Sequence, residues 1–582
     1  MVRSRKNYIV LGVIIGIIVI AVVLKNILPQ MLLGFIITSK SRDDGLALQE
    51  RTYHEISYTE LTSQQRLEDF DYLFSMIKTS LPYVYDMNEK FDFSVLDKED
   101  SYRKAVAECK DDYSFLALMT SILNDIPSGH ATFFPPDYYS YFLSGYYRSD
   151  TVGINLTENM QGKLEAYAKY LVEKQSEYNE KIRSGIYFNY TDGEYICVFG
   201  DESESYSVLV SVNGNEPEEF ITEMVSPTGK IQYDPKNDEA YRSTILFSTA
   251  GNQPVTLKLR LNDGTECEKQ YYCDYDLCYA YDMAWYYSDE VYDYITEDGE
   301  VFESAPDAEE EDADILTDEE NNLAYISITS LNYSDGSAVK EKISEYSDYE
   351  NIIIDLRGNG GGAAGFYKNY IYPALYKDNA SFETTGYVPK NNYTNGLFSS
   401  ISEYIAVCMA NNVWFSDTDE YPEKMYDCNN GEYYKYTASY ELYGDKTLSY
   451  SDNRNVYYIV NSYTCSAADE IVQIVKSCNL GKVVGTNTAG EGLIFGVCCD
   501  WLPNSLLMYQ YCPTYAIDSE GVNNNLYGTQ PDIYAGVTVE ESLHYYTMSD
   551  EGTDVYSLPA RRIWDNNYKV ILKEIGTIKD AA

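Results

Sequence analysis

From residue 323 to residue 484, short apolar runs alternate with segments whose apolar residues recur at helical spacing. Short apolar runs of this kind are typical of strands buried on both faces, and strands that alternate with helices form parallel sheets. The pattern therefore predicts an α/β domain in the C-terminal half of the chain. The expected elements are strand 324–328, helix 338–346, strand 352–356, a helix from Gly365, strand 456–460, a helix from Ser466 and strand 482–484.

A glycine-rich turn follows the expected strand 352–356. Glycine adopts positive φ readily and leaves room for backbone N–H groups to converge on a small anion or a developing oxyanion. No Gly-Lys-Ser/Thr follows the turn, so a phosphate-binding P-loop is not supported. Taken alone, the turn is compatible with a structural role or with an oxyanion hole. Its glycines are Gly358, Gly360, Gly361 and Gly362.

Ser466 stands between the expected strand 456–460 and a helix that continues from Ala467. One interpretation is a helix N-cap, in which the hydroxyl accepts a hydrogen bond from a free backbone N–H. The other is a nucleophile, with the amide of Ala467 at the helix start available to an oxyanion. The local sequence leaves both open.

Together the two turns resemble the tail-specific and tricorn-core serine peptidases, the family that includes the C-terminal processing peptidases. The family's Asp-x-Arg-x-Asn-x-Gly-Gly turn stands here as Asp355-Leu-Arg357-Gly-Asn359-Gly-Gly361-Gly362, and its Thr-x-Ser-Ala-Ala-Glu/Asp turn as Thr464-Cys-Ser466-Ala-Ala-Asp469. The resemblance implies a crotonase-like fold, a nucleophilic Ser466, and an oxyanion hole formed by the amides of Gly361, Gly362 and Ala467.

A serine nucleophile needs a base, and the chain contains only 3 histidines. His54 follows the membrane-proximal segment and His544 lies in a polar stretch, so both are expected at the surface. His130 lies in a Ser-Gly-His-Ala-Thr turn after a helix-like segment. This turn resembles the one that carries the general base in the tricorn-like branch of the family, which implies that His130 is the base.

The other branch of the family uses a lysine downstream of the serine, and Glu491 stands at that position. A glutamate cannot act as an amine base, so the sequence disfavours a Ser-Lys dyad. Glu491 is then either a polar neighbour of the site or a solvated loop residue, and we expect the latter.

The residue that orients the histidine departs from the family pattern. The tricorn-like branch has a glutamate three residues before a Gly-x-x-Pro-Asp turn, where this chain has Asn525. Asparagine can orient an imidazole but cannot stabilise imidazolium with a full charge. Asn525 is the predicted orienting residue, and Glu520 is an alternative if the loop is registered differently. Cys465 occupies the variable position before the serine and is not expected to be the nucleophile.

The remaining chain predicts five segments. They are a signal anchor or transmembrane segment at 1–40, a helical domain at 55–136 that delivers His130, a degenerate PDZ-like β-rich module at 150–280, the α/β peptidase core at 322–545 and a C-terminal extension at 546–582.

Two segments have no assigned place in these domains. The acidic run 307–314 is interpreted as a solvated linker. Residues 377–450 do not fit the alternation of strands and helices and are interpreted as an insertion.

The N-terminus and the charge bear on location and partners. Residues 8–24 form an uncharged apolar run preceded by Arg3, Arg5 and Lys6, long enough at about 1.5 Å per residue to cross a bilayer as an uncleaved anchor. We therefore expect a single-pass membrane protein with an extracytoplasmic body. A net charge of −49 argues against nucleic acid as a partner.

Cysteines and histidines give no sign of a metal site. The 12 cysteines lack the paired spacing of a zinc ribbon and do not by themselves predict disulfides. No HExxH motif is present, and we expect neither metal nor cofactor.

The sequence as a whole predicts a membrane-anchored serine endopeptidase that acts on protein or peptide substrates. The alternative is a peptidase-like protein that has lost catalysis and binds peptides or other ligands. A third possibility is a structural cell-surface scaffold. Substrate specificity and oligomeric state are left open.

Overall fold

The structure is a computed structural model, and it describes most of the chain from residue 59 to residue 576. The predicted membrane segment and His54 lie outside the described residues. Among those that are described, no helix is both long and apolar enough to cross a membrane. The described ranges are 59–91, 93–134, 185–199, 204–223, 229–249, 253–273, 313–391, 413–450 and 454–576, with a few single positions between 166 and 174.

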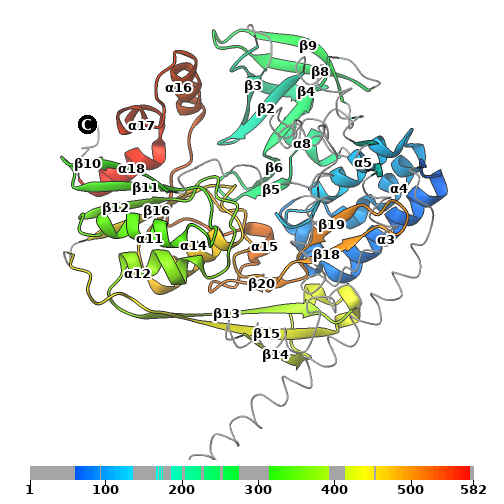
Figure 1. The fold of residues 1–582 in the computed structure, drawn as a ribbon. Helices are drawn as coiled ribbons and strands as arrows, with labels where there is room; N and C mark the ends of the chain where they lie inside the picture. The colour runs from blue at the N-terminus through cyan, green and yellow to red at the C-terminus, as the bar shows by residue number, and fades with distance from the viewer. Residues whose placement is uncertain are drawn as a thin grey trace, which may run out of the picture.

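A six-stranded sheet forms the centre of the C-terminal half (Figure 1). Its strands, in spatial order, are β10 (Ala313–Asp318), β11 (Leu323–Ile328), β12 (Asn351–Asp355), β16 (Asn455–Val460), β17 (Lys482–Gly485) and β21 (Ile533–Tyr534). All neighbouring pairs are parallel except β10 with β11. The predicted α/β alternation is therefore confirmed. The antiparallel edge strand β10 was not predicted, because its first residues continue the acidic run.

Helices cover both faces of this sheet. Ile352 and Ile354 pack into a core shared with α11 (Gly336–Glu345), the π-helical turn η4 (Tyr367–Ile371), α12 (Tyr372–Leu375) and α14 (Ala467–Cys478). The alternate residue Ile353 packs against α18 (Asn566–Glu574) on the other face. This alternation is the period of two expected of a strand buried on both sides.

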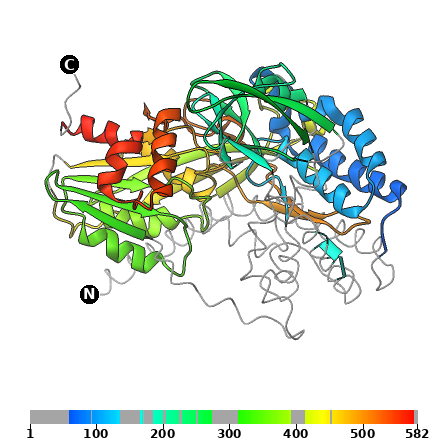
Figure 2. The same ribbon diagram turned by 90° about the horizontal axis from the view of Figure 1, so that it is seen from above.

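The C-terminal helices are therefore a layer of the core rather than an appended extension. Helix α16 (Val539–Asp550) spans the predicted boundary between residues 545 and 546, so that boundary is wrong. Helix α17 (Leu558–Trp564) and α18 follow it, and Figure 2 shows these helices on the side of the molecule opposite the N-terminal helices.

The predicted N-terminal helical region is present. It contains α3 (Ser63–Ser80), the 3-10 segments η2 (Pro82–Glu89) and η3 (Val95–Lys98), α4 (Glu99–Glu108) and α5 (Asp112–Asn124). Thr62 begins α3 with a capping box, and Asp111 caps α5. The apolar faces of these helices pack against β18 (Cys498–Trp501) and β19 (Met508–Tyr511) from the far end of the sequence. The short strand β1 (Thr132–Phe133) pairs with β19 and so ties the helical region to the core.

A β-rich module occupies residues 185–273. Its main sheet has the order β7-β2-β3-β4-β8-β9, and the Asn213-Gly214 turn after β4 has positive φ at both residues. The strands and helix of the module are β2 (Ile186–Thr191), β3 (Glu194–Phe199), β4 (Val208–Val212), α8 (Pro217–Glu223), β5 (Ile231–Asp234), β6 (Glu239–Arg242), β7 (Thr244–Phe247), β8 (Gln253–Arg260) and β9 (Glu266–Cys273).

The insertion has a sheet of its own. Strands β13 (Ala380–Pro389), β14 (Val413–Thr418) and β15 (Tyr433–Leu442) join β20 (Tyr515–Ile517) in a four-stranded sheet. Two short 3-10 turns, η6 (Glu423–Met425) and η7 (Cys428–Gly431), lie between β14 and β15. Short helix α15 (Asn524–Tyr527) follows β20.

Candidate active site

Ser466 lies at the end of the loop that joins β16 to helix α14. Its backbone has φ of 56°, a left-handed value that is uncommon for a residue with a side chain. The Ser466 N–H donates to the Gly490 carbonyl over 3.0 Å, while the side chain makes no cap hydrogen bond to the helix. The N-cap interpretation is therefore wrong. A strained backbone with an unengaged hydroxyl at a helix start is the arrangement expected of a presented nucleophile.

His130 reaches the core from the N-terminal helical region. It follows α5 in the turn before β1, which the pairing with β19 holds in place. The Lys230 ammonium of the β-rich module donates to the carbonyls of Leu123 and Ala131 on either side of this turn. The His130 side chain is 16% exposed. Three separate parts of the chain thus fix its position.

Glu491 is the acid that contacts His130. Its Oε2 lies 2.7 Å from His130 Nδ1 and accepts from the His130 N–H over 3.0 Å, while Oε1 accepts from the Ser128 hydroxyl. Burial alone would raise the pKa of Glu491, but the charge of His130 and these hydrogen bonds outweigh it and hold the pKa below its usual range. The expectation that Glu491 is a solvated loop residue is wrong, because its side chain is completely buried.

The loop around Glu491 is shaped by two glycines. A Cβ atom on Gly490 would lie 2.0 Å from the Asn524 carbonyl oxygen, and one on Gly492 would lie 2.2 Å from the Glu470 nitrogen. Gly492 N–H donates to the Asp469 carboxylate of helix α14 over 3.0 Å. The loop therefore lies directly against the helix that Ser466 begins, and Glu491 itself adopts φ of 64° there.

Ser466 and His130 belong to the same site by these contacts. A Cβ atom on Gly129, next to His130, would lie only 2.7 Å from Cys465 Sγ, next to Ser466. Gly490, beside Glu491, accepts the Ser466 N–H. None of the hydrogen bonds among the described residues joins the Ser466 hydroxyl to His130. Such contacts are often long in unliganded enzymes and shorten when substrate binds.

Asn525 does not take the position predicted for it. It is fully buried, its Oδ1 accepts from the Ala516 N–H over 3.0 Å, and its Nδ2 lies 4.0 Å from Cys512 Sγ. These contacts anchor α15 to β20 and none reaches His130. The alternative acid Glu520 is exposed and contacts Asp518 through its backbone. Neither residue is placed to orient the imidazole.

The predicted oxyanion donors differ in availability. The Gly361 N–H is already engaged by Asn359 Oδ1 at 2.9 Å. The N–H groups of Gly362 and Ala467 have no acceptor among the residues that the structure describes. A Cβ atom on Gly361 would lie 2.8 Å from Ser466 Cβ and 2.9 Å from the Ala467 nitrogen, so the glycine turn touches Ser466 directly. The free amides therefore belong to Ala467, next to Ser466 in the chain, and to Gly362, next to the Gly361 that packs against Ser466.

Cys465 is not suited to take the place of Ser466 as a nucleophile. Burial, with the charges of Glu491 and Asp469, raises the pKa of the Cys465 thiol well above its usual range, which disfavours the reactive thiolate. Cys465 forms no disulfide. No group of three or more metal-ligating side chains occurs in the described ranges.

A cavity of about 1120 Å³ lies beside the site. It is formed between the β-rich module, the ends of the core strands and the C-terminal helices. It reaches the loop at Asn461, Ser462 and Tyr463 that leads to Ser466, and Asn487 of the loop that leads to Glu491. Neither Ser466 nor His130 lines it, so the cavity adjoins the candidate site without containing it.

The sequence pointed to Ser466 and His130 and to Asn525 as the orienting residue, whereas the structure places Glu491 against His130. The family pattern places the orienting acid three residues before the Gly-x-x-Pro-Asp turn, where this chain has Asn525. A local signal was available in Gly490-Glu491-Gly492, because an acid between two glycines suggests a loop in close contact with another element. Ser128, two residues before His130, carried no signal of its own.

Comparison with known proteins identifies a family for the core of the chain. Residues 322–535 match the model of peptidase family S41. These residues form an S41 peptidase domain. The predicted resemblance to tail-specific serine peptidases and the assignment as a serine peptidase are thereby confirmed, and the S41 match contains Ser466, Glu491 and the glycine turn. None of the curated proteins compared with the chain matches it.

Several solved structures are similar to the S41 chain at low identity. Mature CPAF complexed with lactacystin is 12% identical, with 88% of this chain and 98% of that chain covered and a TM-score of 0.44. The photosystem II D1 C-terminal processing protease is 13% identical, with 82% and 94% covered and a TM-score of 0.31. The tricorn protease is 13% identical, with 88% and 37% covered and a TM-score of 0.27.

Proposed function

We propose that this S41 peptidase is a membrane-anchored, extracytoplasmic endopeptidase in which Ser466 is the nucleophile, His130 the general base and Glu491 the orienting carboxylate. The observation that carries the proposal is the His130–Glu491 contact beside a strained serine at the start of α14. A histidine held by a buried carboxylate is the means by which serine hydrolases activate a hydroxyl of high pKa.

In the proposed mechanism the Ser466 hydroxyl attacks the carbonyl of the scissile peptide bond and passes its proton to His130 Nε2. The carboxylate of Glu491 accepts from Nδ1, which fixes the tautomer that leaves Nε2 free to act as base. The oxyanion of the tetrahedral intermediate accepts hydrogen bonds from the N–H groups of Gly362 and Ala467. His130 then returns the proton to the leaving amine, and water hydrolyses the acyl-enzyme by the same route.

Glu491 carries out in this proposal the task expected of the residue at position 525. It comes from the loop position where the lysine-dependent branch of the family has its base. The His-carboxylate pair is thus assembled from a different part of the same domain. The alternative of a catalytically silent binding protein rested on the absence of a carboxylate at position 525, and Glu491 removes that reason.

Two finer parts of the proposal rest on sequence. The apolar run 8–24 supports a signal anchor, and the resemblance to the family supports a crotonase-like core and a degenerate PDZ-like module at residues 185–273. The adjoining cavity supports a peptide substrate, because it offers room for several side chains next to the loop before Ser466.

Labelling with a fluorophosphonate probe tests the nucleophile. The wild-type protein is expected to label at Ser466, and Ser466→Ala to lose labelling completely. Ser462→Ala is the matched control, because Ser462 lies in the same loop but lines the adjoining cavity. Equal labelling of wild type and Ser466→Ala would overturn the proposal. Comparison of membrane and secreted proteomes with and without Ser466→Ala would then identify the substrates.

A further inference from the structure

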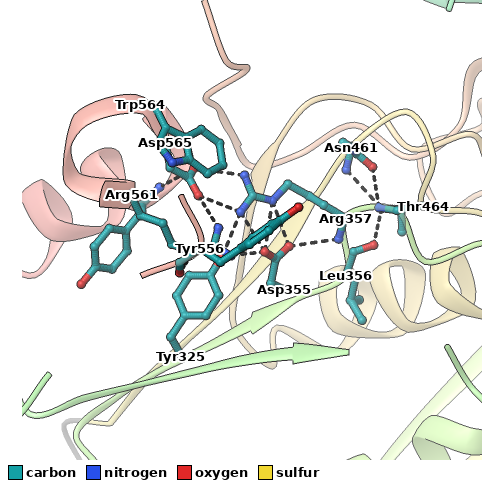
Figure 3. A network of polar contacts seen from close by, with 12 residues as sticks. Tyr325, Asp355, Leu356, Arg357, Asn461, Thr464, Tyr556, Arg561, Trp564 and Asp565 are labelled. Atoms are coloured by element: carbon teal, nitrogen blue, oxygen red, sulfur yellow. Dashed lines mark hydrogen bonds and ion pairs between the residues drawn. The ribbon is translucent and has the colours of Figure 1, made fainter. Parts of the chain in front are cut away.

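A buried ion-pair network joins the C-terminal helices to the glycine turn (Figure 3). Asp565 lies between α17 and α18, where its side chain caps α18 by accepting from the Tyr568 N–H. The same carboxylate accepts from Arg357 Nη1 at 3.0 Å and from Arg357 Nη2 at 2.7 Å. This is the two-pronged geometry in which arginine binds a carboxylate most strongly. Asp565 therefore binds Arg357, a residue of the family's Asp-x-Arg motif that lies 208 positions earlier in the chain.

The network balances its charges inside the protein. On its other side, Arg357 donates to Asp355 through Nε at 3.0 Å and Nη2 at 2.8 Å. Arg561 donates to Asp565 at 2.9 Å. The Asp565 side chain is fully buried, and the Arg357 side chain is 13% exposed. Two guanidinium groups thus face two carboxylates, and loss of either carboxylate would leave a buried positive charge without its partner.

The ion pairs of Asp565 also lower its pKa. Burial alone would raise its pKa, but the charges and hydrogen bonds of Arg357 and Arg561 outweigh this effect and hold the pKa below its usual range. The carboxylate is therefore ionised at neutral pH, as the two-pronged contact requires.

The residues on either side of Arg357 bind the loop that leads to the nucleophile. The Leu356 carbonyl accepts from Thr464 Oγ1 at 2.9 Å, and the Gly358 N–H donates to Asn461 Oδ1 at 3.1 Å. Two residues further on, the Asn359 carbonyl accepts from the Cys465 N–H at 3.1 Å. Figure 3 shows Thr464 and Asn461 beside the backbone that carries Arg357. Movement of Arg357 would therefore be transmitted to both the glycine turn and Ser466.

We propose that Asp565 is a positioning residue that fixes the glycine turn, and with it the oxyanion amides, through Arg357. The C-terminal helices are on this account a required part of the catalytic domain. The inference rests on the proposed function for its activity readout, but its structural part can be measured independently.

The experiment compares Asp565→Asn with Arg562→Gln in the full chain. Arg562 is the matched control, because it lies on α17, shortly before Asp565, and joins that helix to the central sheet through Asp318, without contact to Arg357. Each variant is measured for the rate of fluorophosphonate labelling, for thermal unfolding and for hydrogen exchange of the backbone at residues 357–362.

The proposal expects Asp565→Asn to label about 10- to 100-fold more slowly than wild type and to exchange faster at residues 357–362. Arg562→Gln should match wild type in both measurements. If folded Asp565→Asn labels and exchanges like wild type, the proposal is overturned. If Asp565→Asn does not fold, Asp565→Glu is measured in its place, because glutamate keeps the charge but shifts the carboxylate. Labelling and exchange of Asp565→Glu at the wild-type rates would overturn the proposal.

The two proposals fail in distinguishable ways. If wild type shows no labelling that depends on Ser466, the proposed function fails. The exchange measurement alone then decides the role of Asp565: faster exchange in Asp565→Asn supports it, and unchanged exchange overturns it.

Discussion

Two buried carboxylates near the glycine turn and Ser466 have contrasting partners. Glu491 faces an imidazole that can gain and lose a proton, whereas Asp565 faces two guanidinium groups that remain charged at any relevant pH. The His130 side chain keeps a path to solvent at 16% exposure, while Asp565 has none. The first arrangement suits proton transfer and the second suits fixing a backbone.

The two carboxylates have separate tasks in the proposed mechanism. The proton transfers at His130 Nε2, while the Glu491 contact at Nδ1 holds the imidazole and does not itself anchor the glycine turn. The Arg357–Asp565 pair supplies that anchor within the same domain. The glycine turn lies between them, in contact with Ser466 on one side and carrying Arg357 on the other.

Among the tests of this contrast, replacement of His130 should have the largest effect on the labelling rate. His130→Gln should lower the fluorophosphonate labelling rate by about 10²- to 10⁴-fold, because the general base is lost, with only a small change in thermal stability. His544→Gln is the control, since His544 is exposed on α16. Labelling by His130→Gln at the wild-type rate would remove His130 from the mechanism.

Replacement of a glycine where the two regions meet should have the next largest effect. Gly361→Ala would place a Cβ atom 2.8 Å from Ser466 Cβ at a φ of 104°, and we expect labelling about 10²-fold slower because the nucleophile is displaced. Gly358→Ala is the matched control, because it lies in the same turn at a φ of 74° but meets no atom within 4 Å.

The two glycine variants separate backbone strain from contact with the nucleophile. Both carry the cost of positive φ, about 1–2 kcal/mol of stability, so both should unfold at lower temperature. Gly358→Ala should nevertheless label close to the wild-type rate. Equal loss of labelling in the two variants would show that strain in the turn, and not its contact with Ser466, controls reactivity.

Glu470 provides a third buried carboxylate, one for which no direct ion pair is seen in the described part of the chain. Burial raises its pKa from 4.5 to about 7. The folded state therefore keeps a proton that the unfolded state releases near pH 4.5, and the stability due to this group falls as the pH rises from 4.5 to about 7.

Removing this titration should have the smallest effect. Relative to wild type, Glu470→Gln should be stabilised above about pH 7 by on the order of 3 kcal/mol more than below pH 4.5. Chemical denaturation at several pH values measures the difference, with the exposed Glu441→Gln as control. A stability difference independent of pH would show that Glu470 does not titrate in this interval.

The parts of the fold that follow from local pattern were predictable from sequence. Strands β11, β12, β16 and β17 are short apolar runs, and α14 has regular helical spacing, so their periodicity identifies them. The Ser466 turn and the His130 turn were found because their residues match a family motif. Edge strand β10 was hidden because it begins inside an acidic run.

The contacts that complete the site could not be read from local pattern. Glu491 meets His130 across 361 residues, and Asp565 meets Arg357 across 208. Such pairs depend on how separate helices, strands and loops pack together, and neither hydrophobic periodicity nor composition predicts that packing. The family register named position 525, where the structure has an asparagine bonded to Ala516. Sequence thus pointed to Ser466 and His130 but not to the acid that contacts His130.

The central claim is that Glu491 is the carboxylate that serves His130. The most direct measurement is the fluorophosphonate labelling rate of Glu491→Gln beside that of Glu520→Gln, the exposed acid near the family position. We predict that Glu491→Gln labels about 10²-fold more slowly or worse, while remaining folded, and that Glu520→Gln labels like wild type. Wild-type labelling by folded Glu491→Gln would contradict the account.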